Sequence, residues 1–432
     1  MSSASGTERP YRSLFCSFLW PRHPGRSGGE IRDFHLLRRL LTQSAVEAFA
    51  LQGDAPERAD PLAEQVESLH VPDRLATPSA ALRLRVALRR LGLPVPGPML
   101  HSDVGHKLAA VETLAPLVQQ ALDRDDPDFV FVSPQLNPLA LRLDTRRTRA
   151  RLVLATYDVE AVRMERLAGS APWLRRPGMK AEAARAAAFE RAQLLRFDGV
   201  IAVSDLDRQA FVERYGLVPE RVLVVENGVD PDYFAFRERP EAVPPEVVFV
   251  GALGYRSNAE AAWRLARDVM PRLRRARPEV TLRLVGQGPD AALRSRHDGR
   301  LTVVTGAVDD VRPHLARATV ACLPLVSGSG TKYKLLEALS AGVPVVCSPL
   351  AAEGLAVEHG RHLLVAETDD AVAAAVGRLL DDADLAHRIA HAGRRLVAER
   401  YAWDVNLPRL DPWLLEIARW PKGRSVEAPS PP

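Results

Sequence analysis

The sequence predicts an α/β protein with two Rossmann-like lobes, each built on a parallel sheet. The chain has 432 residues, which is more than a single hydrophobic core of ordinary size accommodates. Short apolar runs alternate with longer helical patterns along most of the chain, and this alternation is typical of parallel sheets. A charged, proline-rich stretch at 237–246 interrupts the alternation, which then restarts. We therefore expect a linker at 237–246 with one lobe on either side.

The composition is that of a chain that folds around a core. Hydrophobic residues make up 47% and charged residues 26% of the sequence, which argues against a disordered or fibrous protein. The cysteines Cys16, Cys322 and Cys347 are widely spaced in apolar runs, so they predict neither a disulfide framework nor a metal site. No apolar run approaches the roughly 18 residues of a membrane-spanning helix. These features favour a reducing cytoplasm.

Arginines gather in the first half of the chain, where they predict a basic face. They are Arg83, Arg85, Arg89, Arg90, Arg142, Arg146, Arg147, Arg149 and Arg151. Such a face attracts an anionic lipid surface, an anionic acceptor or nucleic acid, although solvated helix faces explain the same pattern. We expect peripheral contact with an anionic membrane at most, and no nucleic acid partner.

The first lobe is predicted at 11–236, after a disordered terminus at 1–10. Its expected elements are the strands 14–20, 128–133, 151–156, 199–204 and 222–225 and the helices 31–41 and 179–195. Gly28 and Gly29 lie in the loop between the first strand and the first helix. This loop either brings backbone amides toward a phosphate or is a plain flexible turn.

The second lobe is predicted at 247–400, where the strand and helix patterns restart. Its expected elements are the strands 247–250, 281–285, 301–305, 320–323 and 343–347 and the helices 258–275, 311–317, 336–341, 369–380 and 384–400. Residues 421–432 are expected to form a disordered tail.

The loop that follows strand 320–323 has the chemistry of an anion site. Residues 327–332, Ser-Gly-Ser-Gly-Thr-Lys, join a buried strand to the start of a helix. Glycines let the backbone approach a ligand, and the unpaired amides and dipole of a helix start attract anions. Lys332 and Lys334 add positive charge, and Glu337 lies where a carboxylate accepts hydrogen bonds from ribose hydroxyls. An ordinary loop with a Lys–Glu salt bridge explains the same residues.

The segment 330–346, GTKYKLLEALSAGVPVV, resembles the donor-site segment of glycosyltransferase family 4. Similar segments follow the order of that family. They are FVG at 249–251, LVGQGP at 284–289, TGAVDDV at 305–311, EGL at 353–355, FDGVIAVS at 197–204 and VENGVD at 225–230. The resemblance covers nearly all of the second lobe and weakens upstream of Arg151.

This resemblance implies a GT-B architecture, with a nucleotide-sugar bound in the cleft between the lobes, no metal, and transfer with retention of the anomeric configuration. Glu337 would bind ribose, and the base would lie against Gly306, Ala307 and Val308. The residues implied to bind the diphosphate are Gly28, Gly29, Gly328, Ser329, Gly330, Thr331, Lys332 and Lys334. Residues 401–420 would form a crossover helix that returns to the first lobe, the alternative being an amphipathic structural helix.

One position departs from the family pattern. Members often have a second glutamate eight residues before the ribose-binding one, where it contacts the donor sugar, and Ser329 stands there in this chain. A serine exchanges hydrogen bonds but lacks the carboxylate charge. Asp158 and Glu160 follow strand 151–156 and are candidates for acceptor contact or proton removal. Asp158 as the cap of a helix that begins near Glu160 is an equally good explanation.

The sequence thus predicts a retaining glycosyltransferase that moves sugar from a nucleotide-diphosphate sugar to a saccharide or lipid-linked acceptor. It would need no cofactor beyond this co-substrate and act in the cytoplasm, or at the inner face of the membrane, in bacterial polysaccharide or envelope glycan synthesis. A nucleotide-sugar epimerase and a non-catalytic sugar-nucleotide-binding protein are the alternatives. His387 and His391 lie four apart on a predicted helix, but no third ligand lies near them in the sequence, so no metal site is predicted.

Overall fold

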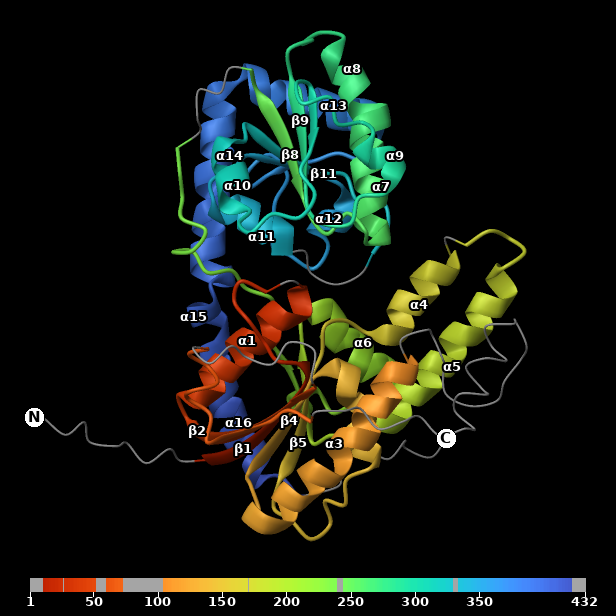
Figure 1. Ribbon diagram of the computed structural model, residues 1–432, viewed down its shortest axis with the longest axis vertical. Helices are drawn as coiled ribbons and strands as arrows, with labels where there is room; N and C mark the ends of the chain where they lie inside the picture. Colours follow the sequence, from red (N-terminus) through yellow and green to blue (C-terminus); the bar gives the residue numbers. More distant parts are fainter. Residues whose placement is uncertain are drawn as a thin grey trace, which may run out of the picture. The chain divides into compact units, whose positions relative to one another are not determined.

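The computed structural model describes residues 11–25, 27–51, 60–72, 104–169, 171–238, 244–328 and 333–421. The chain divides into two compact units (Figure 1). One unit ends at Val225 and is completed by residues from Leu407 onward, and the other runs from Glu226 to Asn406. Each contains one parallel sheet with helices packed against it, which confirms the predicted α/β class with two Rossmann-like sheets. None of the described helices is long and apolar enough to cross a membrane.

The first unit contains a seven-stranded parallel sheet in the order β3-β2-β1-β4-β5-β6-β7. Its strands are β1 (Tyr11–Leu19), β2 (Ser44–Leu51), β3 (Ser68–His70), β4 (Phe129–Val132), β5 (Arg151–Ala155), β6 (Gly199–Ala202) and β7 (Val222–Val224). The strand β1 pairs with β2 on one side and β4 on the other, so the strand order reverses there. Open parallel sheets bind ligands beyond the carboxyl ends of the strands at such a switch point.

Helices of the first unit come from both ends of the chain. They are α1 (Gly28–Leu41), α3 (Val104–Asp125), η1 (Pro134–Leu141), α4 (Glu160–Gly169), α5 (Arg176–Leu194), α6 (Asp205–Tyr215), η2 (Pro219–Arg221), η5 (Leu407–Arg409) and α16 (Leu410–Arg419). Trp413 and Ile417 of α16 pack so closely on β6 that a Cβ at Gly199 would lie 2.4 Å from Ile417. The C-terminal helix is therefore an integral part of the first unit, covering β6.

The second unit contains a six-stranded parallel sheet in the order β10-β9-β8-β11-β12-β13, with its switch point between β8 and β11. The strands are β8 (Glu246–Val250), β9 (Thr281–Val285), β10 (Thr302–Val304), β11 (Val320–Leu323), β12 (Val345–Cys347) and β13 (Leu364–Val365). The helical segments are α7 (Arg256–Arg264), η3 (Leu265–Val269), α8 (Met270–Arg274), α9 (Ala291–Arg294), α10 (Arg312–Arg317), α11 (Tyr333–Ser340), α12 (Pro349–Ala352), α13 (Asp369–Asp381), α14 (Ala383–Leu396), η4 (Val397–Tyr401) and α15 (Trp403–Asn406). The predicted linker at 237–246 falls within this unit, and its residues 239–243 lie outside the described ones.

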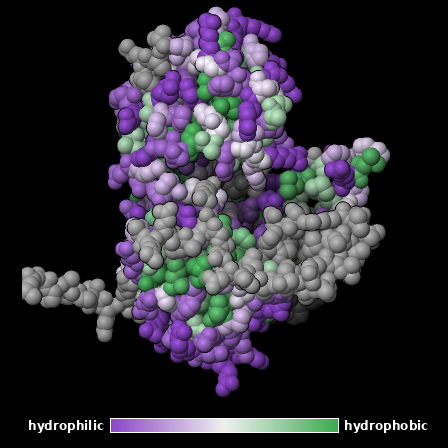
Figure 2. Space-filling model, in the orientation of Figure 1, coloured by the Kyte–Doolittle hydropathy of each residue, from purple (hydrophilic) through white to green (hydrophobic). Residues whose placement is uncertain are grey.

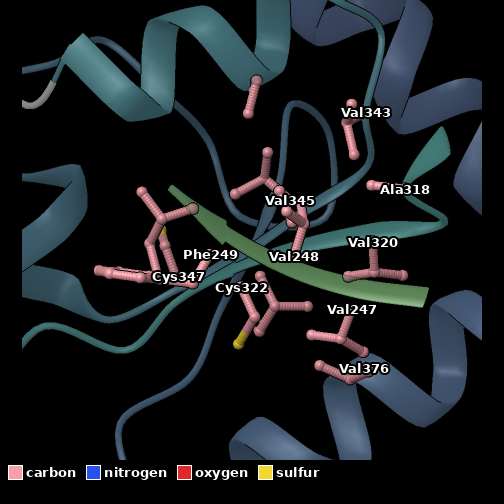
Figure 3. Close-up of a cluster of buried hydrophobic side chains, with 14 of the residues drawn as sticks. Val247, Val248, Phe249, Ala318, Val320, Cys322, Val343, Val345, Cys347 and Val376 are labelled. Atoms are coloured by element: carbon pink, nitrogen blue, oxygen red, sulfur yellow. The ribbon is translucent and has the colours of Figure 1, made fainter. Parts of the chain in front are cut away.

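The core of the second unit surrounds β8, the strand beside the switch point. Val247, Val248 and Phe249 are each at most 1% exposed, so both faces of the strand are buried (Figure 3). A parallel sheet with helices on both faces requires such continuous apolar strands. Cys322 and Cys347 are free thiols in this core, and burial raises the pKa of both. They serve as small packing residues, and the strands they occupy form a rigid base for the loops at the carboxyl edge.

Candidate functional site

Polar side chains gather beyond the carboxyl end of β8, at the switch point of the second unit. Lys334 extends from the first turn of α11 to Gly251, the residue that follows β8. A Cβ at Gly251 would lie 2.9 Å from the Lys334 Nζ, so a larger residue there would displace the ammonium. The Nζ also lies 5.1 Å from the centroid of the Phe249 ring. A fixed positive charge therefore lies where open parallel sheets bind their ligands.

Asn258, on α7, holds the Lys334 ammonium in this position. Its Nδ2 donates a 2.9 Å hydrogen bond to the carbonyl oxygen of Ala252, which orients the amide. The Oδ1 of Asn258 then accepts a hydrogen bond from the Lys334 Nζ. Sequence reasoning missed Asn258, because nothing in its local pattern shows that a lysine 76 residues later reaches it.

Glu337 lies one turn after Lys334 on α11, and its side chain is partly buried. Burial raises the pKa of its carboxyl group to about 7, and the Lys334 charge opposes this rise. Within the part of the chain that the structure describes, the carboxylate has no hydrogen-bond partner. A carboxylate withdrawn from water gains from a ligand that brings hydroxyl donors. Lys334 and Glu337 thus present a cation and an acceptor on adjacent turns of one helix.

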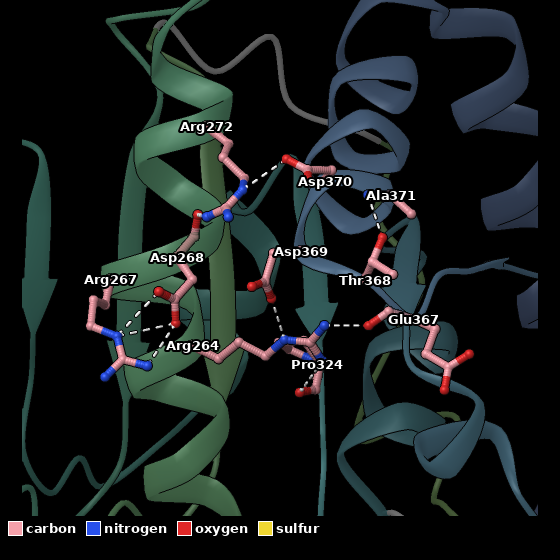
Figure 4. A network of polar contacts seen from close by, with 10 residues as sticks. All are labelled: Arg264, Arg267, Asp268, Arg272, Pro324, Glu367, Thr368, Asp369, Asp370 and Ala371. Carbon is pink, nitrogen blue, oxygen red and sulfur yellow. Dashed lines mark hydrogen bonds and ion pairs between the residues drawn. The ribbon is translucent and has the colours of Figure 1, made fainter.

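The loop between β11 and α11 is anchored at its start by Arg264, at the end of α7 (Figure 4). Its Nη1 donates to the carbonyl oxygen of Pro324 at 3.2 Å, and its Nε donates to the Oδ1 of Asp369 at 2.6 Å. A further bond joins Arg264 to the carbonyl oxygen of Glu367. One guanidinium group therefore ties the carboxyl end of β11 to the start of α13 and fixes where the loop begins.

Only the first part of the predicted diphosphate loop is described. The Ser327 hydroxyl bonds to the Glu260 carboxylate, and Gly328 has a φ of +116°, a conformation that favours glycine. The predicted diphosphate ligands Ser329, Gly330, Thr331 and Lys332 lie outside the described residues.

Three glycines connect the turns along the carboxyl edge of the sheet. The Gly251 amide donates to the carbonyl oxygen of Val285 at 2.9 Å, and the Gly286 amide donates to that of Gly306 at 3.2 Å. Gly286 has a φ of +145°, and a Cβ there would lie 1.9 Å from the Gly251 carbonyl oxygen. The turn predicted to hold the base, which includes Gly306, is therefore joined through β9 to the position of Lys334.

The predicted base-binding residues differ in how exposed they are. Gly306 has a φ of +72°, and the position of its missing Cβ has no atom within 4 Å. Ala307 is exposed, and Val308 is partly buried against the core. The backbone at Gly306 therefore faces open space, as approach by a planar ring requires.

In the first unit, Gly28 and Gly29 form the first turn of α1. Ser27 caps this helix by accepting a 3.3 Å hydrogen bond from the Glu30 amide. A Cβ at Gly29 would lie 2.7 Å from the Tyr157 ring, so the small size of Gly29 is explained by packing on Tyr157. The Tyr157 hydroxyl reaches Asp33 on the same helix at 2.9 Å.

Asp158 and Glu160, the candidates for acceptor contact, follow β5 and share the cation Arg163. The Arg163 guanidinium lies 3.9 Å from the Asp158 carboxylate and 2.5 Å from that of Glu160. The helix α4 begins at Glu160. The amides of Glu160 and Ala161 donate to the Glu190 carboxylate at 3.0 and 3.1 Å. A carboxylate from α5 therefore binds the first amides of this helix.

Comparison with known families matches both units. A model described as glycosyltransferase family 4 matches residues 28–233, and one described as glycosyl transferases group 1 matches residues 244–382. The phosphatidyl-myo-inositol mannosyltransferase of Mycobacterium tuberculosis is 33% identical over 218 residues, which are 48% of this chain and 56% of that protein. The glycogen synthase of the same organism is 30% identical over 221 residues, which are 48% of this chain and 51% of the relative. The chain spans about half the length of these curated relatives.

Solved structures match over nearly the whole chain. Sucrose-phosphate synthase from Thermosynechococcus elongatus superimposes with a TM-score of 0.69 at 15% identity, covering 94% of this chain and 99% of that one. HepE of Anabaena, solved in complex with UDP and glucose, gives a TM-score of 0.63 at 15% identity, covering 94% and 100%. At this identity the likeness establishes the fold alone.

Proposed function

The chain belongs to glycosyltransferase family 4, and we propose that it transfers a glycosyl group from a nucleoside diphosphate sugar to a saccharide or lipid-linked acceptor. One observation carries the proposal: Lys334 and Glu337 lie one turn apart on α11 at the switch point of a parallel sheet. A cation held by Asn258 suits a diphosphate, and the carboxylate of Glu337, which burial withdraws from water, suits a ribose diol.

The donor would lie along the carboxyl edge of the second sheet. Lys334 would contact the diphosphate together with the loop that starts at Ser327 and Gly328. Glu337 would accept hydrogen bonds from the ribose hydroxyls, and the open backbone at Gly306 would receive the base. The donor would thus run from the diphosphate near Gly251 to the base near Gly306. Backbone hydrogen bonds join the turns of Gly251, Gly286 and Gly306 in the same order.

During transfer, the bond between the anomeric carbon and the diphosphate oxygen breaks, and a bond to the acceptor oxygen forms on the same face of the sugar. Negative charge grows on the departing diphosphate, where the fixed Lys334 ammonium stabilises it. The proton of the acceptor hydroxyl passes to the departing phosphate oxygen or to a carboxylate. We assign Asp158 and Glu160 to acceptor contact, where the Arg163 guanidinium lies beside both carboxylates.

We propose a lipid-linked acceptor and place the membrane contact at the hairpin of α4 and α5. Between these helices, Trp173 is 74% and Leu174 is 73% exposed. Arg175, Arg176 and Lys180 follow, and residues 166–181 contain no acidic side chain. In Figure 2 hydrophobic and hydrophilic surface alternate at the end of this hairpin. Exposed Trp and Leu beside basic residues suit the interface of an anionic bilayer, and one relative acts on phosphatidyl-myo-inositol, as its name states.

The basic face expected from the sequence is largely neutralised where it is described. Arg142, Arg146, Arg149 and Arg151 each lie within 4.0 Å of a carboxylate, those of Glu112, Asp144, Asp128 and Asp198. Arg83, Arg85, Arg89 and Arg90 lie outside the described residues. This is why the hairpin, rather than the 142–151 segment, carries the proposed membrane contact.

The test is a ligand panel followed by a turnover assay. UDP, GDP and ADP and their sugars are added to the full-length protein, and the proposal expects at least one to raise the unfolding temperature of the wild type but not of Glu337→Ala. The effective sugar-nucleotide is then incubated with and without a lipid-linked saccharide. Sugar transfer that requires the acceptor supports the proposal. Conversion of the sugar-nucleotide without an acceptor favours an epimerase, and no thermal shift with any ligand overturns the donor site.

A further inference from the structure

The structure brings a third ligand group to His387 and His391, which corrects the prediction that no metal ligand lies near them. Glu238 comes from the segment that follows Phe236 and lies against α14. Its Oε2 lies 3.7 Å from the Nε2 of His387, and its Oε1 lies 3.4 Å from the Nε2 of His391. The ligand atoms of the three residues all lie within 4.8 Å of one another.

These separations resemble those around a transition-metal ion. A tetrahedral ion with ligands at about 2.0–2.1 Å holds its ligand atoms about 3.3 Å apart. Two imidazoles four residues apart on a helix point in the same direction, and a carboxylate completes a ligand set that borderline ions such as Zn²⁺ accept. The ring centroids of the two histidines lie 4.1 Å apart, so the two rings are side by side.

A second observation is the environment of the His391 ring. Its Nε2 is shielded from water, yet it makes no hydrogen bond to the part of the chain that the structure describes. The Glu238 carboxylate lies 3.4 Å away but does not have the geometry of an acceptor. The ring itself is held by Phe236, whose centroid lies 4.6 Å from it. A shielded nitrogen without a hydrogen bond is costly, and a metal ion would satisfy this nitrogen and the carboxylate together.

We propose that Glu238, His387 and His391 bind one divalent ion of the borderline transition-metal class, with Zn²⁺ as the expected occupant. The fourth position is left to water, because no other ligand group of the described residues joins the cluster. The exposed fractions of the His387 and Glu238 side chains, 60% and 70%, place the ion near solvent. The bound ion would therefore exchange with ions in solution.

The site extends an existing attachment of α14 to the chain segment around 231–238 (Figure 1). Arg394, on the same face of α14, donates to the carbonyl oxygens of Pro231 at 3.1 Å and Phe234 at 3.2 Å. The metal would continue this attachment to Glu238, just before strand β8. Its role would therefore be to fasten this segment to α14, apart from the proposed sugar transfer.

The test uses Co²⁺ as a spectroscopic probe on the full-length, tag-free protein. The wild type is expected to bind one Co²⁺ per chain with a visible d–d absorption, and Zn²⁺ is expected to displace it. His387→Ala and Glu238→Gln are each expected to weaken binding at least about tenfold, since even indirect ligand support is worth that much. Arg388→Ala, at an exposed position next to His387 on the same helix, keeps the three ligands and is the matched control.

A second measurement checks the fastening role. Zn²⁺ is expected to raise the unfolding temperature of the wild type and of Arg388→Ala, but not of His387→Ala. Equal Co²⁺ affinity in His387→Ala and the wild type would mean adventitious binding and would overturn the proposal. Zinc binding that occurs only as the chain dimerises would also overturn it. No nucleotide is present, so the outcome is independent of the proposed transferase activity.

Discussion

The Tyr157 hydroxyl donates a 2.9 Å hydrogen bond to the Oδ2 of Asp33, which is 4% exposed in α1. Burial raises the pKa of the Asp33 carboxyl to about 7, while the Tyr157 bond and the Arg32 charge oppose this rise. Arg32 is held in turn by the carbonyl oxygen of Val225 at 2.9 Å. The carboxyl end of the first sheet thus contains a buried acid that titrates near neutral pH and accepts a hydrogen bond from a tyrosine in the loop after β5.

Asp33 is expected to make the first unit less stable as pH rises. The pKa of Asp33 in the folded state lies above its value in the unfolded state. Its favourable contribution to the free energy of unfolding is therefore present below about pH 4 and is lost as pH rises through about 7. Asp33→Asn should therefore be more stable than the wild type at pH 8, by about 1–3 kcal/mol, and nearly equal at pH 4. Urea unfolding of both proteins at the two pH values measures this.

Tyr157→Phe is the companion to that experiment. It removes the donor from a buried carboxylate, which costs about 1–3 kcal/mol when Asp33 is ionised and less when it is protonated. The loss of stability should therefore be greater at pH 8 than at pH 4, and this difference between the two pH values should vanish in the Asp33→Asn background, because asparagine does not titrate. An equal loss at both pH values would show that the ring packing on Gly29, rather than the hydroxyl, is what stabilises this region.

Glu337 links nucleotide affinity to pH. Because its pKa is about 7, the carboxylate that accepts ribose hydroxyls is lost as pH falls through 7, and affinity should fall with it. Glu337→Gln should bind the nucleotide about 10- to 150-fold more weakly at pH 8, which corresponds to a loss of about 1.5–3 kcal/mol of binding free energy. The affinity of this variant should depend little on pH. Calorimetric titration between pH 6 and 8 measures both effects. A wild-type affinity that is flat across this range would remove Glu337 from the ribose site.

The sequence predicted two strands of the second sheet at their observed bounds. The predicted strands 281–285 and 320–323 coincide with β9 and β11. Alternation of polar and apolar residues indicates a half-buried strand such as β9, and a continuous apolar run is consistent with a fully buried strand such as β11. The strand β2 was missed. It follows α1 after only two residues, without glycine or proline, so its apolar residues appear to continue the helix. The short edge strand β3 has only partly buried residues and no such run.

The candidate site was also predicted only in part. Lys334 and Glu337 could be chosen from the sequence because helical periodicity places them one turn apart. The groups that position them or their neighbours are distant in sequence: Asn258 holds Lys334, Glu190 caps α4, and Glu238 meets His387. No local pattern encodes these pairs, because each depends on how elements pack after the sheet has formed. The sequence therefore identified the residues with charge but not the contacts that set their positions.

Gly251 tests whether the Lys334 ammonium acts on the diphosphate. A Cβ at this position would lie 2.9 Å from the Nζ and 3.1 Å from the Asn258 side chain, so Gly251→Ala should displace the ammonium. Binding of the nucleoside diphosphate should weaken about tenfold or more, whereas binding of the nucleoside, which lacks phosphate, should change little. Gly178→Ala is the control, because no atom lies within 4 Å of its missing Cβ. Equal losses for nucleoside and diphosphate would contradict the assignment.

The hairpin of α4 and α5 makes the proposed membrane contact testable with vesicles. Trp173→Ser with Leu174→Ser removes the exposed apolar pair, and Arg175→Glu with Arg176→Glu reverses two charges. Each basic residue near an anionic surface contributes about 1 kcal/mol, so loss of two should weaken binding to phosphatidylglycerol vesicles about 30-fold. Removal of the apolar pair should also lower binding to these vesicles. Binding to neutral phosphatidylcholine vesicles should be weak for the wild type and for all variants.

Leu206→Ser is the matched control for the apolar pair, because Leu206 is 54% exposed on α6 of the same unit and lacks the basic neighbours of the hairpin. It should leave vesicle binding unchanged. Sedimentation with vesicles at low and at high salt measures the effect, and high salt should weaken the wild type because it screens surface charge. If the hairpin variants sediment as the wild type does, the hairpin is not the membrane contact. If instead they turn a dimeric wild type into a monomer, the exposed pair serves contact between chains.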